Sequence, residues 1–251
     1  MSWRMAALTD VGRVRVRNED WLSYDESAGL AILADGMGGY AGGEIASRLA
    51  VNTCSQVVQA EGAGMLRECD MRRAFREANR AVFMEACMDP ALRHMGTTLA
   101  ALALRLDGSV LVAHVGDSRI YRLRKNILHC LTRDHSLLRE QLDAGMIGSK
   151  DEAPPAWKGL LTRALGVGAE VEPELDVLAL EPGDIYLLCS DGLTDMLSEE
   201  DIGEVLLALG SRPAVAAELL VELANDQGGT DNISVIVVSS REGGSLGAEV
   251  D

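Results

Sequence analysis

The stretch that decides the fold is Leu30-Ala31-Ile32-Leu33-Ala34-Asp35-Gly36-Met37-Gly38-Gly39. Its apolar first half ends abruptly in a carboxylate, and glycines follow. A short apolar run bounded by turn-forming residues indicates a buried strand. We therefore expect Asp35 at the end of a strand, where the backbone can bend sharply and a cation can reach the side chain.

The same combination of an apolar run, a glycine and an aspartate returns at three later positions. Apolar runs precede Val115-Gly116-Asp117-Ser118 and Cys189-Ser190-Asp191-Gly192, and one follows Gly229-Thr230-Asp231-Asn232. A single Asp-Gly pair is a common turn, so the repetition is the informative feature. It raises the hypothesis that the four aspartates converge.

Converging carboxylates need cations, because two of them about 4 Å apart repel by roughly 4 kcal/mol at an effective dielectric constant of 20. Oxygen ligands without cysteine or histidine favour hard ions, Mg²⁺ or Mn²⁺. Two such ions about 3.5–4 Å apart can bridge a water, lower its pKa and clamp an in-line displacement at phosphorus. Such a reaction also calls for a cation on the phosphoryl oxygens. Arg15, in a polar loop beside Glu19 and Asp20, is the candidate.

Composition limits the classes of function. The chain has 251 residues, of which 47% are hydrophobic, and a formal net charge of −16. This charge argues against binding nucleic acid or an anionic membrane through a basic face. No run approaches the ~20 apolar residues of a membrane span, and no signal peptide is expected at the start. The chain has five cysteines, an odd number, scattered along the sequence without any Cys-x-x-Cys pair. This pattern is typical of free thiols in a cytoplasmic protein.

Turn residues between apolar runs indicate antiparallel strands. Asp107-Gly108 and Arg124-Lys125-Asn126 predict two hairpins, and Pro182-Gly183 predicts a third, so the chain combines helices with antiparallel sheet. Helices are expected at about 44–59, 71–88, 134–144, 199–209 and 213–225. Residues 147–159 lose this periodicity and are expected to form a surface insertion.

Seven motifs, in their order along the chain, resemble bacterial members of the protein phosphatase 2C family, the metal-dependent serine/threonine protein phosphatases. They are Thr9-Asp10 through Asn18-Glu19-Asp20, Asp35-Gly36-Met37-Gly38-Gly39, Gly96-Thr97-Thr98, Val115-Gly116-Asp117-Ser118-Arg119, Asp134-His135-Ser136, Ser190-Asp191-Gly192 and Gly229-Thr230-Asp231-Asn232. One such motif would be weak evidence, whereas seven in order are specific.

The resemblance implies an architecture. It predicts an α+β fold, a four-layer α-β-β-α sandwich of two mainly antiparallel sheets flanked by helices. Residues 1–240 would form a single phosphatase domain with a flap at about 145–165. Residues 241–251 would form a flexible tail.

The resemblance also implies a metal centre of two Mn²⁺ or Mg²⁺ ions with a third, weaker site. Asp35 would bridge the two ions, and the carbonyl of Gly36 would bind one of them. Asp191 and Asp231 would complete the second site. Asp117, with Asp191, would hold the third ion. A water or hydroxide that bridges the metals would attack phosphoserine or phosphothreonine.

Further roles follow from the same resemblance. Arg15 would bind phosphate, Glu19 and Asp20 would hold water in the outer shell of the metals, and Asn232 would orient its neighbour. The partners would be phosphorylated proteins and a cognate bacterial serine/threonine kinase, in cytoplasmic signalling. One departure is Met37, where some relatives carry a histidine proposed as general acid.

A second departure from the family pattern concerns the flap. Many relatives end the flap with His-Pro, whereas this chain has Pro154-Pro155-Ala156-Trp157-Lys158, so flap-based substrate preference cannot be carried over.

The sequence argues against three other functions. An inactive module that recruits phosphoproteins would not need the intact set of aspartates. A haloacid-dehalogenase-type enzyme needs an aspartate where this chain has Met37. A calcium module would need a D-x-[DN]-x-[DN]-G loop, which the sequence lacks.

Some candidate residues also have a simpler explanation. Asp117 could cap a turn, Arg15 could be a surface ion-pair partner, and Glu19-Asp20 could keep a loop soluble. Structural hydrogen bonds are expected of His114, in an apolar strand, and of His135, at a helix start.

Overall fold

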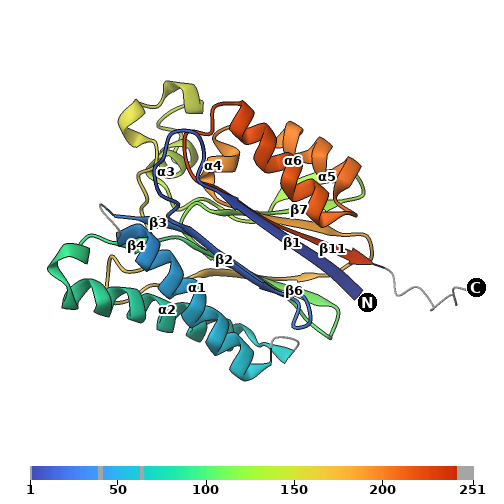
Figure 1. Cartoon of the computed structure of the whole chain (residues 1–251), viewed down its shortest axis with the longest axis horizontal. Coiled ribbons are helices and arrows are strands. Elements are labelled where there is room, and N and C mark those ends of the chain that lie inside the picture. Colours follow the sequence, from blue (N-terminus) through green and yellow to red (C-terminus); the bar gives the residue numbers. More distant parts are fainter. Residues whose placement is uncertain (1, 39–41, 63–64, 242–251) are drawn as a thin grey trace, which may run out of the picture.

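Two antiparallel β-sheets lie face to face, with helices on the outer side of each (Figure 1). The computed structural model describes residues 2–38, 42–62 and 65–241. Sheet A has five strands, in the spatial order β1 (Ser2–Asp10), β11 (Ile233–Arg241), β10 (Ile185–Cys189), β7 (Arg119–Arg124) and β8 (Ile127–Cys130). Sheet B has six, in the order β2 (Asp20–Asp25), β3 (Leu30–Met37), β5 (Leu99–Leu104), β6 (Ser109–Val115) and β9 (Glu174–Ala179), with β4 (Gly96–Thr97) paired to β3.

Two long helices cover sheet B and two cover sheet A. The pair on sheet B is α1 (Gly42–Glu61) and α2 (Glu68–Met88), and the pair on sheet A is α5 (Glu199–Leu209) and α6 (Pro213–Asp226). In α1, Ala46, Ala50, Cys54 and Val58 recur every fourth residue and are fully buried. Residues four apart share one face of a helix, and these small side chains let α1 approach the sheet closely. The predicted four-layer sandwich is confirmed.

Buried apolar side chains fill the three spaces between the layers. Strand β10 shows how: Tyr186 and Leu188 belong to the cluster between the sheets, while Leu187 faces the helices of sheet A. Strand β3 does the same, with Ile32 toward α1 and α2 and Leu33 toward sheet A. Since side chains alternate along a strand, a strand in the middle of this sandwich is apolar on both faces.

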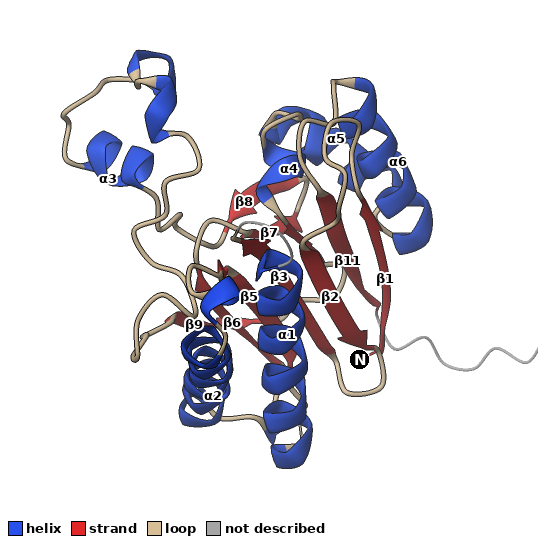
Figure 2. Cartoon of the chain, turned by 60° about the vertical axis from the view of Figure 1, so that its left-hand side comes forward, coloured by secondary structure: helices blue, strands red, loops and turns tan. Residues whose placement is uncertain are grey.

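The remaining short elements lie near one end of the sandwich. The segment around the predicted flap contains α3 (Leu137–Asp143) and the 3₁₀ turns η3 (Lys150–Glu152) and η4 (Pro155–Trp157), which stand beside the sheets rather than on them (Figure 2). The turn η2 (Pro90–Leu92) follows α2, and α4 (Asp191–Thr194) follows β10. None of the helices in the described ranges is long and apolar enough to cross a membrane.

The predicted hairpin at Pro182-Gly183 is wrong. The turn exists, with Gly183 at a φ of +86°, but β9 pairs with β6 in sheet B and β10 pairs with β7 and β11 in sheet A. The chain therefore crosses from one sheet to the other at this point. The residues of a tight turn are the same in both cases, and the partner strands, which are distant in sequence, decide between them.

Strand β1 was not predicted from the sequence. It pairs with β11 along its whole length, from Ser2 opposite Arg241 to Asp10 opposite Ile233. The strand segment that begins at Gly96 is divided, because β4 and β5 are separated at Thr98. The hairpins β5–β6 and β7–β8 are confirmed, and helix ends differ from the predictions by three residues or fewer.

Two predictions fall partly outside the described residues: Gly39 of the fold-deciding stretch, and all of the predicted 241–251 tail except Arg241, which ends β11. The five cysteines are free thiols, as predicted.

Candidate active site

A cleft of about 510 Å³ opens where strand ends of both sheets meet the flap. We call it the acidic cleft. Its lining comprises Arg15, Val16, Arg17, Glu19, Asp35, Gly36, Met37, Gly38, Thr98, Asp117, Gly159, Leu161, Asp191, Asp231 and Asn232. The structure thus brings together every predicted site residue except Asp20. Asp20 lies directly below the lining, opposite Asp35 in the β2–β3 register.

The four predicted metal-binding aspartates reach the cleft from both sheets. Asp35 lies near the end of β3, and Asp117 lies in the loop from β6 to β7. Asp191 is the first residue of α4, directly after β10, and Asp231 lies just before β11. All four side chains are half-buried. Each of them lines the acidic cleft, so the carboxylates are accessible from it.

Hydroxyl groups of the Gly96-Thr97-Thr98 motif fix the backbone of Asp35. The amide N–H of Asp35 donates to Thr98 Oγ1 at 2.8 Å. Its carbonyl accepts from Thr98 N–H at 2.9 Å and from Thr97 Oγ1 at 2.8 Å. Thr98 Oγ1 also lies 2.7 Å from Ser118 Oγ. These contacts explain why the strand divides at Thr98, a role that the sequence did not reveal.

Close packing explains the glycines beside Asp35. A Cβ on Gly36 would lie 2.1 Å from the carbonyl oxygen of Gly43, and one on Gly43 would lie 2.7 Å from Glu19 Oε1. The start of α1 is therefore pressed against the end of β3. No larger residue fits at either position without moving the backbone.

The acids hold one another's pKa values high. Desolvation raises the pKa of Asp35 well above its ordinary range, and the charges of Asp20 and Asp191 raise it further. Desolvation also raises the pKa of Asp20 to about 7, that of Asp117 to about 8 and that of Asp191 to about 6. In Asp117 and Asp191, neighbouring carboxylates add to the effect. Such a cluster is stable as a set of charges only if cations neutralise it.

The donor set fits hard divalent cations. Among the described lining residues, the side chains that can bind a cation are carboxylates, the Asn232 amide, the Thr98 hydroxyl and the Met37 thioether, with no histidine or cysteine. Oxygen donors of this kind suit Mg²⁺ and Mn²⁺. In addition, Asp20 Oδ1 is buried without a hydrogen-bond partner, while Ser190 Oγ donates to its Oδ2 at 2.8 Å. An unpaired buried oxygen of this kind has a free lone pair for a water or an ion.

Arg15 stands at the rim of the cleft. Its Nη2 donates to Asp231 Oδ2 at 2.6 Å, and half of its side chain is exposed. The guanidinium is therefore within reach of both the acids and an incoming anion.

Asn232 joins the loop that carries Arg15 to the acids. Its Oδ1 accepts from Glu19 N–H at 2.8 Å, and its Nδ2 donates to the carbonyls of Val11 and Arg17 at 3.0 and 2.9 Å. Its backbone N–H donates to Asp231 Oδ1 at 2.8 Å. The contact with its neighbour is thus made by the backbone, while the side chain holds the loop.

The flap closes one side of the cleft. Gly159 and Leu161 line it. Lys158 Nζ lies 2.9 Å from Asp195 Oδ2, at the end of α4. Sequence reasoning assigned no role to Lys158, because nothing local in the chain marks its partner.

Comparison with known proteins assigns the chain to a family. The family model for protein phosphatase 2C matches residues 13–224. The chain belongs to the protein phosphatase 2C family. The resemblance carried by the seven motifs is therefore confirmed, and the chain is a phosphoprotein phosphatase, a hydrolase.

Relatives within this family match over nearly the whole chain. Protein phosphatase PhpP of Streptococcus pneumoniae is 38% identical over 244 residues, which are 95% of this chain and 98% of PhpP. The serine/threonine phosphatase stp of Listeria monocytogenes is 38% identical over 236 residues, which are 92% of this chain and 93% of the relative.

Solved structures of 2C phosphatases share the fold. The crystal structure of the Mycobacterium tuberculosis serine/threonine phosphatase PstP/Ppp is 37% identical, has a TM-score of 0.87, and covers 96% of this chain and 100% of that one. The catalytic domain of PstP in complex with two manganese ions is 38% identical, with a TM-score of 0.84 and coverage of 96% and 99%.

Proposed function

We propose that the acidic cleft holds two divalent ions, manganese or magnesium, and that with them this phosphatase hydrolyses phosphoserine and phosphothreonine in proteins. The observation that carries the proposal is the convergence of Asp35, Asp117, Asp191 and Asp231, from both sheets, on one cleft whose donors are almost all oxygen. The manganese-bound relative with the same fold supports it.

The proposed ligand roles are those that the family resemblance implies. Asp35 and the carbonyl of Gly36 would hold one ion, and Asp35, Asp191 and Asp231 would hold the other. Asp117 and Asp191 would hold a third, weaker one. When bound, such ions supply Lewis acidity at phosphorus and acidify water for the attack.

The chain's own residues bind the substrate and keep the acids in place. Arg15 would move its guanidinium from Asp231 to the phosphoryl oxygens, which a planar fork can bind bidentately. Glu19 lines the cleft and Asp20 lies below it, where both would hold ordered water. Met37 lines the cleft but carries no proton to give, and no histidine is among the described lining residues. The described part of the lining therefore offers the leaving serine or threonine no imidazole acid.

The proposal extends to the partners and the location of the phosphatase. A serine/threonine phosphatase reverses the work of a serine/threonine kinase, so we place a cognate bacterial kinase and its phosphorylated targets among the partners, in signalling. Free cysteines in the described chain suit a cytoplasmic location.

Phosphate release from a phosphothreonine peptide tests the proposal. The purified protein should turn the peptide over with Mn²⁺ and stop when a chelator is added. Asp191→Asn should lower kcat by about 100-fold or more, since a ligand matters at least as much as the groups that support it. Asp226→Asn, at the exposed end of α6, is the matched control and should keep full activity. Peptide binding without turnover would instead identify an inactive recruiting module.

A further inference from the structure

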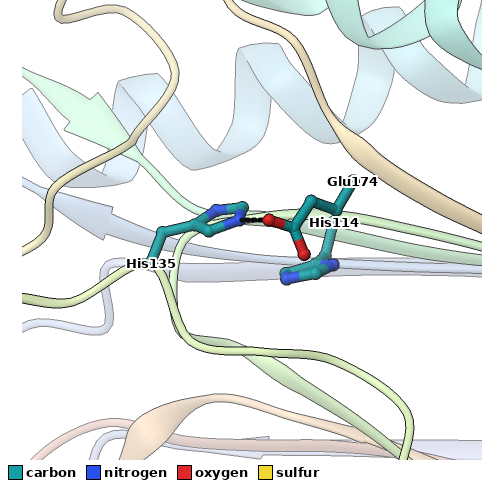
Figure 3. Close-up of side chains that lie close together, drawn as sticks. All are labelled: His114, His135 and Glu174. Atoms are coloured by element: carbon teal, nitrogen blue, oxygen red, sulfur yellow. Dashed lines mark ion pairs between the residues drawn. The ribbon is translucent and has the colours of Figure 1, made fainter. Parts of the chain in front are cut away.

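Two stacked histidines and a glutamate form a cluster outside the lining of the acidic cleft (Figure 3). His114 of β6 and His135, just before α3, have ring centroids 4.7 Å apart and ring planes 12° apart. Both are buried, at 4% and 2% exposure. Glu174, opposite His114 in the β6–β9 register, places Oε1 3.0 Å from His135 Nε2. We call these residues the histidine cluster.

The hydrogen-bond partners fix where the protons lie. His135 Nδ1 is 3.0 Å from the backbone nitrogen of Gly116, which can only donate, so Nδ1 accepts. The ring proton is then on Nε2 and points to Glu174. His114 Nε2 lies 2.9 Å from the carbonyl of Arg133, which can only accept, so this nitrogen donates. His135 is thus a neutral imidazole in one defined tautomer, and His114 donates from Nε2.

A metal ion is the alternative use of the histidine cluster, whose ligand atoms lie within 4.8 Å of one another. An ion bound by an imidazole nitrogen lies about 2.0–2.1 Å from it, in the plane of the ring. Stacked rings direct their nitrogens side by side, not at one point. Moreover, Arg163 Nη1 lies 3.1 Å from His135 Nε2 and 3.7 Å from Glu174 Oε1. This guanidinium already neutralises the carboxylate, so the geometry disfavours a metal.

His135 makes two hydrogen bonds to Gly116, the residue before Asp117. Gly116 donates its N–H to the His135 ring, and its carbonyl accepts from His135 N–H at 3.0 Å. Gly116 has a φ of +102°, and a Cβ there would lie 2.6 Å from Thr98 Cγ2. Both backbone polar groups of Gly116 are therefore hydrogen-bonded to His135, and the next side chain along the chain is Asp117 of the acidic cleft.

His135 also holds the returning end of the flap. Its carbonyl accepts from Thr162 N–H at 2.9 Å, and an isolated β-bridge joins Ser136 to Leu161. Arg163, next along, reaches the histidine cluster. A single buried residue thus contacts the Asp117 loop on one side and the flap on the other.

We propose that His135, held in its tautomer by Glu174, is a positioning residue that sets the place of Asp117 in the acidic cleft. The inference rests on the proposed function, in which Asp117 helps to bind a metal. His135 does not touch the substrate or the ions. It acts through Gly116, whose backbone it fixes.

A double-mutant cycle with Mn²⁺ and an aryl phosphate tests whether His135 acts through Asp117. We expect His135→Ala to lower kcat about tenfold, in the range known for groups that support metal ligands. His135→Asn should keep most of the wild-type kcat, because the asparagine Oδ1 can accept from Gly116 N–H. In an Asp117→Asn background, His135→Ala should cost less than about twofold. Independent, multiplying losses, or an asparagine no better than alanine, would overturn the proposal.

Measurements on metal-free protein provide a second readout that needs no activity. Nitrogen-detected NMR should show His135 protonated at Nε2 and unprotonated at Nδ1. The amide of Gly116 should exchange with solvent slowly in the wild type and in His135→Asn, and faster in His135→Gln, whose side chain does not match Nδ1. A proton on Nδ1, or equal exchange in all three proteins, would contradict the inference. Inactive wild-type enzyme would count against the proposed function, while these spectra would still decide the role of His135.

Measuring the zinc content of the purified protein tests whether the histidine cluster binds a metal ion instead. In Asp191→Asn protein, where the acidic cleft is disabled, no tightly bound zinc is expected at the histidine cluster. Stoichiometric zinc that persists in this variant and is lost when Glu174→Gln is added would overturn the positioning role in favour of a metal site.

Discussion

Arg15 and Asp231 show how single residues of this enzyme balance one another. The guanidinium lies 2.6 Å from a carboxylate that is itself a proposed metal ligand. A divalent ion bound by Asp231 would weaken the attraction between this carboxylate and Arg15, and the guanidinium would then be free to bind phosphate. An exposed ion pair of this kind contributes about 0–1 kcal/mol, so the exchange costs little.

Arg15→Lys should therefore raise KM for an aryl phosphate about tenfold and change kcat less. Lysine keeps the charge but loses the bidentate geometry. Steady-state kinetics with Mn²⁺ measures this, with Arg13→Lys as the matched control in the same exposed loop. Equal, small effects of the two substitutions would mean that Arg15 is only a surface ion-pair partner.

At the scale of residues, the sequence predicts the acids of the site better than the groups that hold them. An aspartate beside glycine at the end of an apolar run is a local pattern, and it occurs at Asp35, Asp117 and Asp191. Thr98 and Ser190 carry no such mark, because their acid partners lie 63 and 170 residues away. Only the folded chain brings the Thr98 hydroxyl to the backbone of Asp35 and the Ser190 hydroxyl to the carboxylate of Asp20.

Elements follow the same rule. Apolar strands and helix periods are local, so α5 and the hairpin β5–β6 are predicted well. Which sheet a strand joins is not local, so the turn at Pro182-Gly183 was wrongly expected to close a hairpin. Strand β1, of mixed composition, gains its conformation from nine paired positions on β11 and gives little signal alone.

The flap offers a prediction at the scale of elements. Lys158→Ala removes the contact with Asp195 on α4. Because the pair is exposed, we expect almost no change in Tm and a fall in kcat/KM of at most about fivefold on a phosphothreonine peptide. The aryl phosphate, which has no peptide chain to lie along the flap, should be turned over as before.

The ratio of the two kcat/KM values is the informative measurement for the flap. Lys150→Ala, in η3 of the same segment, is the control and should leave both values unchanged. If Lys158→Ala slows both substrates by the same factor, the residue acts on the chemistry and not on substrate fit.

The whole molecule concentrates unfavourable charge at one end of a stable sandwich. Two sheets and four long helices bury three apolar clusters, one in each space between the layers. This burial stabilises a fold that holds together acids that repel one another. The formal net charge of −16 adds to that repulsion. Without cations, the acidic cleft therefore lowers the free energy of unfolding. Cations that bind the folded chain raise it.

This imbalance predicts the pH dependence of the metal-free protein. An acid whose pKa is higher in the folded than in the unfolded chain binds more protons when folded, so the free energy of unfolding falls as pH rises. Asp20 and Asp117, with pKa values raised to about 7 and about 8, should make Tm fall between pH 6.5 and pH 8 in a chelator. His114 and His135, whose pKa values burial lowers from 6.5, oppose this trend only at lower pH.

Thermal melting across this pH range checks the prediction. Asp117→Asn should melt higher than wild type without metal and show a shallower fall, because one repelling charge is gone. Excess Mn²⁺ should raise the Tm of the wild type most at the high end of the range. A metal-free Tm that rises with pH would show that the acids are not in contact.

The most direct test of the account is a crystal grown with Mn²⁺ and measured at the manganese absorption edge. We predict two strong anomalous peaks in the acidic cleft, both in contact with Asp35, one of them also with Asp191 and Asp231. Peaks that avoid the cleft, or a single peak at His114, His135 and Glu174, would contradict it.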